Sequence, residues 1–220
     1  MSPKVKTAFN EFRKAFCNFC ETSHLGYERI FEDLLRYIIH GFSPNEGSLA
    51  DWRYTAGDNA SFMNLTRLYL KVMDESLNAG EAQWCDVWGT LYEELVKTKG
   101  KSAVFGQFFT PETVATMMAK ICGDSVPGST MTDPCCGSGR FILASHAENP
   151  QGYFVAQDID YICVYMSTVN MLVHGVVGEA ICRDTLRMSE PRFSYRINPF
   201  LNVADSPFHG IPHVIREPSN

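Results

Sequence analysis

The stretch "DPCCGSGR", residues 133–140, places an acidic side chain and two glycines between a short strand-like segment and an apolar run. Residues 129–133 predict a strand, and residues 139–147 predict a helix. Gly137 and Gly139 let the backbone turn tightly and leave room for a ligand to approach. The N-terminus of the helix favours an anionic group at the same place.

Two further acidic residues stand at the ends of the next predicted strands, residues 152–158 and 179–184. A parallel sheet binds ligands at the carboxyl ends of its strands. Asp158, about 20 residues after Gly137, is placed to accept hydrogen bonds from a ribose. With Asp184 at the same edge, these signals predict a nucleoside-type pocket. The glycines alone would also fit an ordinary tight turn, and the Cys135–Cys136 pair fits small filler better than a redox site.

The elements around these residues predict two regions, 1–104 and 105–220. The strand–helix–strand–helix–strand order, with a helix over 160–174, predicts a doubly wound α/β domain with a parallel sheet. Thr110 and Pro111 cap and start a further helix that runs to about Cys122. The first hundred residues predict only helices, with a long loop over 41–60. The helical periodicity covers Phe9–Phe19, Ile30–Ile38, residues 62–78 (capped by Ser61) and residues 82–98.

Composition limits the classes of function. The net charge of −6 indicates that the chain alone binds duplex DNA only weakly, so local arginines or a partner must supply positive charge. The chain opens with no signal peptide and has no apolar run long enough for a membrane span. Eight cysteines could form disulfides, but without a signal peptide we expect a cytoplasmic protein whose thiols are reduced. Two sets have ligand-like spacing but lack a full donor set, so no metal is expected: Cys17, Cys20 and His24, and His209 with His213.

Five segments in order resemble the modification subunits of type I restriction systems: "GQFFTP" (106–111), "DPCCGSG" (133–139), "QDID" (157–160), "NMLVHG" (170–175) and "RDTL" (183–186). These subunits are DNA adenine-N6 methyltransferases that use S-adenosyl-L-methionine. "DVWGTLYEELV" (86–96) is similar to the segment that leads into their methylase domain. The resemblance implies a Rossmann-like methyltransferase domain and a specificity subunit as partner. Separately, a sheet of three strands would leave an open edge, which favours self-association or pairing with a partner.

The resemblance also implies roles for single residues. Asp158 would hold the ribose hydroxyls, and Asp184 the adenine amino group of the cofactor. The remaining cofactor residues form two groups: Gln107, Phe108, Phe109, Thr110 and Pro111 would line its methionine and adenine side, and Asp133, Cys135, Gly137 and Gly139 would wrap its methionine moiety.

The catalytic signature of that family, Asn or Asp followed by two prolines and an aromatic residue, is not found. Its acceptors would position the exocyclic amine of a flipped adenine, and its ring would stack on the base. Two segments come near: Asn198, Pro199 and Phe200, and the rival Asp205, Pro207 and Phe208. Neither follows a long hydrophobic strand. A longer parent chain, completion by a partner, and a protein that binds cofactor without catalysis all fit this pattern.

The sequence leaves three candidate functions. The first is a DNA adenine-N6 methyltransferase of a restriction-modification system. The second is a non-catalytic cofactor-binding or assembly protein derived from that family. A nicotinamide-dependent oxidoreductase fits poorly, because "DPCCGSG" lacks the G-x-G-x-x-G spacing.

Overall fold

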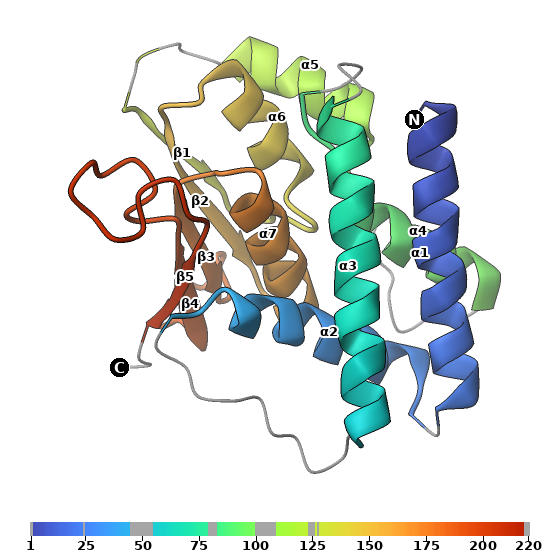
Figure 1. The fold of residues 1–220 in the computed structure, drawn as a ribbon. Helices are drawn as coiled ribbons and strands as arrows, with labels where there is room; N and C mark the ends of the chain where they lie inside the picture. Colours follow the sequence, from blue (N-terminus) through green and yellow to red (C-terminus); the bar gives the residue numbers. More distant parts are fainter. Residues whose placement is uncertain are drawn as a thin grey trace.

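The computed structural model describes residues 2–23, 25–44, 55–78, 83–99, 109–122, 126 and 128–217. The elements within these ranges are α1 (Pro3–Thr22), α2 (Tyr27–Gly41), α3 (Ala56–Asn78), α4 (Val87–Lys99), α5 (Glu112–Cys122), β1 (Thr130–Asp133), α6 (Arg140–Glu148), β2 (Tyr153–Asp158), α7 (Tyr161–Val173), β3 (Gly178–Cys182), β4 (Phe193–Ile197) and β5 (Val214–Glu217). In Figure 1, α1 and α3 stand side by side on one flank of the molecule and the sheet lies on the other.

Local signals explain where several helices begin. The Ser2 hydroxyl accepts a hydrogen bond from the Val5 amide at 3.3 Å, and Pro3 occupies the first turn of α1. The predicted cap of α3 was wrong, because Ser61 lies inside the helix. A capping box precedes it instead: the Thr55 hydroxyl accepts from the Asp58 amide, and the Asp58 carboxylate accepts from the Thr55 amide.

The sheet has the strand order β1-β2-β3-β4-β5. Strands β1 to β3 are parallel, as predicted, with boundaries within two residues of those expected. Strands β4 and β5 add an antiparallel hairpin at the edge of β3, which was not predicted, because "FSYRI" and "VIRE" are only five and four residues long and give a weak strand signal. The sheet is therefore mixed.

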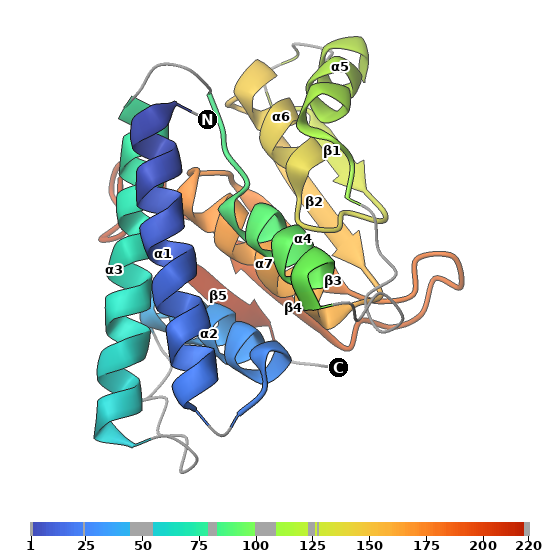
Figure 2. The same cartoon turned by 90° about the vertical axis from the view of Figure 1, so that its right-hand side faces the viewer.

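Helices α6 and α7 contact each other, with α6 packed against β1 and β2 and α7 against β2 and β3. They lie on one face of the sheet, with α4 and α2 packed beside α7 (Figure 2). This arrangement follows from right-handed crossovers between strands in consecutive order. The prediction of a doubly wound sheet, which has helices wound on both faces, was therefore wrong for these two crossovers.

One hydrophobic core joins the helical region to the sheet. Trp88 of α4 is fully buried, and its ring lies 5.7 Å from the ring of Phe12 and 5.7 Å from that of Phe31. Helix α2 packs against α7, and the Val214 amide of β5 donates to the Phe42 carbonyl. The expected boundary between residues 104 and 105 lies outside the described residues, and the regions on either side of it share this core.

Two further features concern membrane-spanning helices and disulfides. Among the described residues, no helix has the length and apolar character needed to cross a membrane. All eight cysteines lie in the described ranges, and none of them forms a disulfide.

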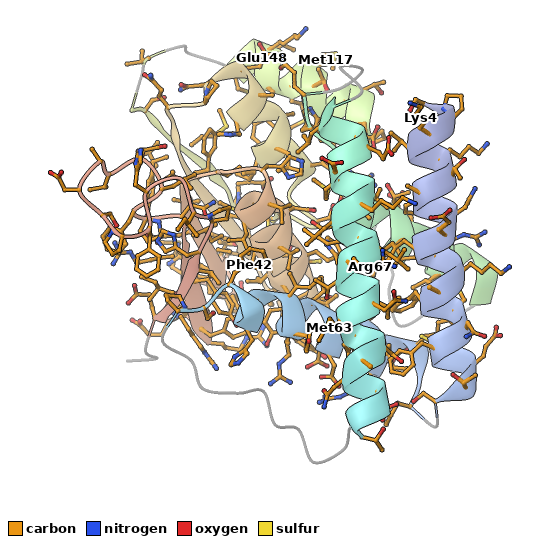
Figure 3. All side chains as sticks on the ribbon, in the orientation of Figure 1. Lys4, Phe42, Met63, Arg67, Met117 and Glu148 are labelled. Atoms are coloured by element: carbon orange, nitrogen blue, oxygen red, sulfur yellow. The ribbon has the colours of Figure 1, made fainter. Side chains whose placement is uncertain are left out.

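The aromatic core predicts a large effect of truncating Phe12. Its side chain is fully buried between Tyr69 and Trp88, so Phe12→Ala should lower the free energy of unfolding by about 3 to 5 kcal/mol through lost contacts and a cavity. Urea unfolding followed by circular dichroism measures this change. Met63→Ala is the matched control, because Met63 is 64% exposed on α3 (Figure 3) and its truncation should change stability by less than about 0.5 kcal/mol. Equal effects of the two substitutions would contradict this packing.

Candidate functional site

The glycine loop between β1 and α6, residues 134–139, forms the centre of the site. Gly137 and Gly139 have φ angles of 54° and 90°, in the left-handed region that favours glycine. The Asp133 carboxylate accepts a hydrogen bond from the Cys135 amide at 3.1 Å and so supports the turn at the end of β1. A side chain at Gly139 would also crowd Ser167 of α7, 3.3 Å from the nearest atom. The predicted strand–glycine turn–helix unit is present.

The end of β2 holds this loop through hydrogen bonds. The Cys136 amide donates to the Gln157 carbonyl at 2.9 Å, and the Gly137 amide donates to the Asp158 carboxylate at 3.0 Å. The other oxygen of Asp158 accepts from the Asp160 amide at 2.9 Å. The structure therefore brings Gly137 and Asp158 together, 21 residues apart in the chain.

The turn after β3 reaches the same edge. The Thr185 hydroxyl donates to the Pro134 carbonyl at 2.7 Å, which connects this turn to the glycine loop. Asp184 lies beside it, and its carboxylate accepts from the Arg187 amide at 3.1 Å and pairs with the Arg187 guanidinium at 3.6 Å. All three predicted strand ends therefore meet at one edge of the sheet.

Burial shapes the electrostatics of this edge. Desolvation raises the pKa of Asp133 and of Asp158, and for Asp133 the nearby charge of Asp158 adds to the increase. Burial raises the pKa of the Cys136 thiol well above its usual value, so this thiol is protonated at neutral pH. Cys136 instead contacts the Ser167 hydroxyl at 3.1 Å. The two acids make the edge suited to a ligand with hydroxyl groups or positive charge.

The segment before α5 contributes one ring to the loop. Phe109 is largely buried, and a Cβ atom on Gly137 would lie 2.9 Å from its ring, so the ring packs directly on the glycine. Helix α5 begins at Glu112, one residue later than predicted, after Thr110 and Pro111. Of the other residues expected here, Gln107 and Phe108 lie outside the described residues.

The first segment predicted to be catalytic, residues 198–200, lies away from this edge. Asn198 follows β4, which runs antiparallel to β3, and Ile197 pairs with Gly178 at the start of β3. Asp158 pairs with Cys182 at the other end, about 14 Å along the strand. The Asn198 side chain is fully buried. It donates to the Leu172 and Val176 carbonyls and accepts from the His213 amide.

Both segments that the sequence offers for catalysis, residues 198–200 and 205–208, belong to the loop between β4 and β5. The Phe200 and Phe208 rings both stack with the His213 ring, with ring centroids 5.7 and 4.7 Å from its centroid. Asp205 is exposed, and Pro207 lies between it and Phe208. The structure does not bring Asn198, Pro199, Phe200 or the rival segment to the glycine loop.

The residues weighed as metal ligands form no such group where the structure describes them. No three His, Cys, Asp or Glu side chains are grouped as a metal site among the described residues. His213 turns one ring nitrogen to the Ile211 carbonyl at 2.9 Å. Cys17 and Cys20 lie on α1, and His24 lies outside the described residues.

Sequence reasoning missed a buried polar cluster beside the loop. Asp86 and Arg140 form an ion pair of 2.7 Å with almost fully buried side chains, and Ser138 joins them. His174, at the end of α7, accepts a hydrogen bond from the Cys85 amide at 3.2 Å. The only local signal was a charged residue inside an apolar stretch, as with Asp86 in "WCDVWG", which does not reveal its partner.

Comparison with known proteins gives a consistent assignment. The profile of the family described as N-6 DNA Methylase matches residues 83–211. The EcoEI methylase subunit of a type I restriction enzyme from Escherichia coli is 24% identical over 66% of this chain and 32% of its own length. The MjaIX methylase subunit from Methanocaldococcus jannaschii is 24% identical over 54% of this chain and 24% of its own. The type II methyltransferase M.MamI from Microbacterium ammoniaphilum is 24% identical over 64% of this chain and 44% of its own.

Among solved structures, a type I restriction-modification methyltransferase subunit from Streptococcus thermophilus aligns with 78% of this chain and 43% of its own, at 19% identity and a TM-score of 0.39. The chain thus spans less than half the length of these relatives.

His174 predicts a pH dependence of stability. Because its Nε2 atom accepts from the Cys85 amide, the folded protein holds it neutral, and burial lowers its pKa to about 4. The unfolded chain takes up this proton near pH 6.5, so the stabilising contribution is complete above that pH and is lost as the pH falls towards 4. We expect this loss to be about 1 to 3 kcal/mol.

The measurement is the free energy of unfolding between pH 7 and 4 for the wild type and for His174→Gln. Glutamine cannot titrate, so the wild type should lose more stability than the variant over this range, while the raised pKa values of Asp133 and Asp158 affect both proteins alike. Parallel pH profiles would show that His174 is not held neutral.

Proposed function

Since the chain belongs to the N-6 DNA methylase family, we propose that it binds S-adenosyl-L-methionine at the carboxyl ends of β1, β2 and β3 and serves DNA adenine-N6 methylation in a restriction-modification system. The observation that carries this proposal is the hydrogen bond of 3.0 Å from the Gly137 amide to the Asp158 carboxylate. It joins the glycine loop to the acid at the end of the next strand, where a nucleoside would be held.

The residues at this edge fit the cofactor. A Cβ atom on Gly137 would collide with Phe109, and one on Gly139 would crowd Ser167. Because these residues are glycines, the Phe109 ring, the glycine loop and the start of α6 lie close together. The Asp158 carboxylate accepts the Gly137 and Asp160 amides on its two oxygens and, with about four acceptor sites in all, can also accept a ribose hydroxyl. Ile159, 56% exposed, offers an apolar side chain beside it. The other proposed contacts are those named from the resemblance: Gln107, Phe108, Phe109, Thr110 and Pro111, Asp133 and Cys135, and Asp184.

When bound, this cofactor supplies an electrophilic methyl group on a sulfonium centre. The glycine loop and Asp133 would orient its methionine end, and Asp158 its ribose. Excluding water from such a site strengthens the electrostatic contacts there. An amide or carboxylate oxygen must then accept hydrogens from the adenine amine, within hydrogen-bond reach.

The position of Asn198 favours a second candidate, a cofactor-binding protein without catalytic activity of its own. Its amide group is engaged by three backbone groups at the opposite end of β3, and it lies in the left-handed region with a φ of 53°. These contacts suit a structural role. Asp205 is exposed and unconstrained by comparison, but it belongs to the same distant loop.

We propose that DNA recognition depends on a partner. Two relatives are named as subunits of type I restriction enzymes, and a specificity subunit would supply the positive field that a chain of net charge −6 lacks. Self-association through an edge of the sheet is the alternative. The proposed setting is the cytoplasm.

Calorimetry with S-adenosylhomocysteine tests cofactor binding. The wild type should bind it, and Asp158→Asn should weaken binding by about 1 to 3 kcal/mol, because the amide group cannot accept as many hydrogen bonds as the carboxylate. Asp74→Asn makes the same chemical change on the exposed surface of α3 and should leave binding unchanged. A folded wild-type protein that gives no heat with either S-adenosylmethionine or S-adenosylhomocysteine would overturn the proposal.

Transfer of labelled methyl groups to an adenine-containing duplex tests catalysis. We expect the 220-residue chain alone to be inactive or nearly so, since neither proline segment lies at the cofactor edge and a displacement of about 1 Å can already cost 100-fold in rate. Steady turnover by this chain would contradict the expectation. Asn198→Ala and Asp205→Ala would then decide which segment carries the chemistry.

A further inference from the structure

We propose that Asp86, which lies before α4 and outside the glycine loop, is a positioning residue that sets the conformation of the loop for cofactor binding. The proposal rests on the proposed function, in which this loop binds S-adenosylmethionine. It assigns to the helical region a direct part in forming the site, through residues 86–93 rather than through packing alone.

The Asp86 carboxylate collects donors from several elements. One oxygen accepts from the Gly89 amide at 2.7 Å and from the Asn170 side chain of α7 at 2.8 Å. The other accepts from the Ser138 hydroxyl at 2.6 Å and from Arg140 Nε at 2.7 Å. The side chain is fully buried, so its charge depends on these four donors in place of water. Two of the four belong to the loop and to the first residue of α6.

The Asn170 amide strengthens this connection. It donates to Asp86 and also to the Ser138 carbonyl at 2.8 Å, so the main chain of the loop is held from a second direction. Ser138 adjoins Gly137, whose amide bonds Asp158. Displacing Ser138 would therefore displace the neighbouring amide that links the loop to β2.

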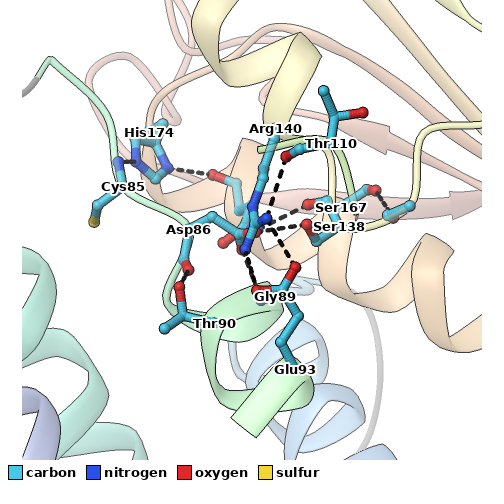
Figure 4. A network of polar contacts seen from close by, with 12 residues as sticks. Cys85, Asp86, Gly89, Thr90, Glu93, Thr110, Ser138, Arg140, Ser167 and His174 are labelled. Carbon is cyan, nitrogen blue, oxygen red and sulfur yellow. Dashed lines mark hydrogen bonds and ion pairs between the residues drawn. The ribbon is translucent and has the colours of Figure 1, made fainter. Parts of the chain in front are cut away.

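Gly89 permits this close approach. A Cβ atom there would lie 2.0 Å from an Asp86 oxygen and 2.6 Å from the Ser138 hydroxyl, so a side chain at this position would push the Asp86 carboxylate away from its donors. Figure 4 shows Gly89 at the point where the first turn of α4 meets these side chains. The absence of a side chain at this position lets α4 lie directly against the loop.

Arg140 extends the same contacts to the segment before α5. Its guanidinium donates to Glu93 of α4 at 3.0 Å and to the Thr110 carbonyl at 3.2 Å (Figure 4). It also lies 5.7 Å from the centre of the Phe109 ring, which packs on Gly137. One arginine thus joins Asp86, the start of α6 and the ring that covers the loop.

A positioning role and a purely structural role differ in what they change. A structural role lowers the stability of the protein but leaves the cofactor affinity of the folded fraction unaltered. A positioning role weakens binding by the folded protein and loosens the Gly137 and Gly139 amides, which bond to Asp158 and to the Cys136 carbonyl. Hydrogen exchange at these two amides reports the loop directly and without ligand.

The experiment compares the wild type, Ser138→Ala, Asp86→Asn and the double variant. Ser138→Ala removes one hydrogen bond to Asp86 and leaves every charge in place, so it tests the proposal even where Asp86→Asn fails to fold. We expect Ser138→Ala to raise the Kd for S-adenosylhomocysteine about tenfold in calorimetry and to accelerate exchange at the Gly137 and Gly139 amides. The double variant should bind no more weakly than Asp86→Asn alone, because both changes remove the same contact.

Glu94→Gln is the matched control. Glu94 neighbours Glu93 on α4, but its carboxylate pairs with Arg13 on the exposed side of the helix at 3.4 Å. The Glu94→Gln variant should have the same Kd for S-adenosylhomocysteine as the wild type and the same exchange at the Gly137 and Gly139 amides.

Two outcomes would overturn the inference in distinguishable ways. If the wild type binds S-adenosylhomocysteine and Ser138→Ala has the same Kd and the same amide exchange, then Asp86 only stabilises the fold, and the proposed function stands. No binding by the wild type would remove the proposed function and this inference with it.

Discussion

The buried ion pair between Asp86 and Arg140 is the interaction on which the arrangement of the site depends. Both side chains are almost completely removed from water, and such charges are tolerated only when partners replace the lost hydration. Here the partners come from the start of α4, from the glycine loop and from α7. Moving any one of these elements would take a hydrogen-bond partner from a buried charge, so the pair favours this arrangement over others of similar hydrophobic packing.

Hydrophobic packing supplies the stability around this pair. Trp88 lies two residues after Asp86 and packs its ring against Phe12 and Phe31, which belong to α1 and α2. Helix α2 in turn packs on α7, and α7 packs against β2 and β3, which carry the site. The helical region and the sheet therefore stabilise one another, and the polar cluster determines how they are oriented at the loop.

The hairpin of β4 and β5 has a different physical role. Its antiparallel pairing extends the sheet beyond β3 and directs the loop of residues 198–213 to the end of the sheet opposite the glycine loop. The buried Asn198 side chain satisfies two carbonyls at the end of α7 and one amide ahead of β5. An asparagine in the left-handed region can make these contacts because its short amide bonds nearby backbone. The same residue type that can serve catalysis in a methylase here closes the loop.

The sequence by itself determined the strand–glycine turn–helix unit, the acids at the ends of β2 and β3, and the helical character of the first hundred residues where they are described. These features depend on local periodicity, on the φ angles open to Gly137 and Gly139, and on the rule that parallel strands end at one edge. Only the tertiary structure decided that β4 runs antiparallel and that Asn198 lies at the end of β3 opposite the glycine loop. It also decided that Asp86 bonds Ser138, 52 residues away in the sequence, and Asn170, 84 residues away. The reason is physical: a strand of five residues takes its direction from its neighbours, and a buried carboxylate is satisfied by donors that no local pattern along the chain identifies.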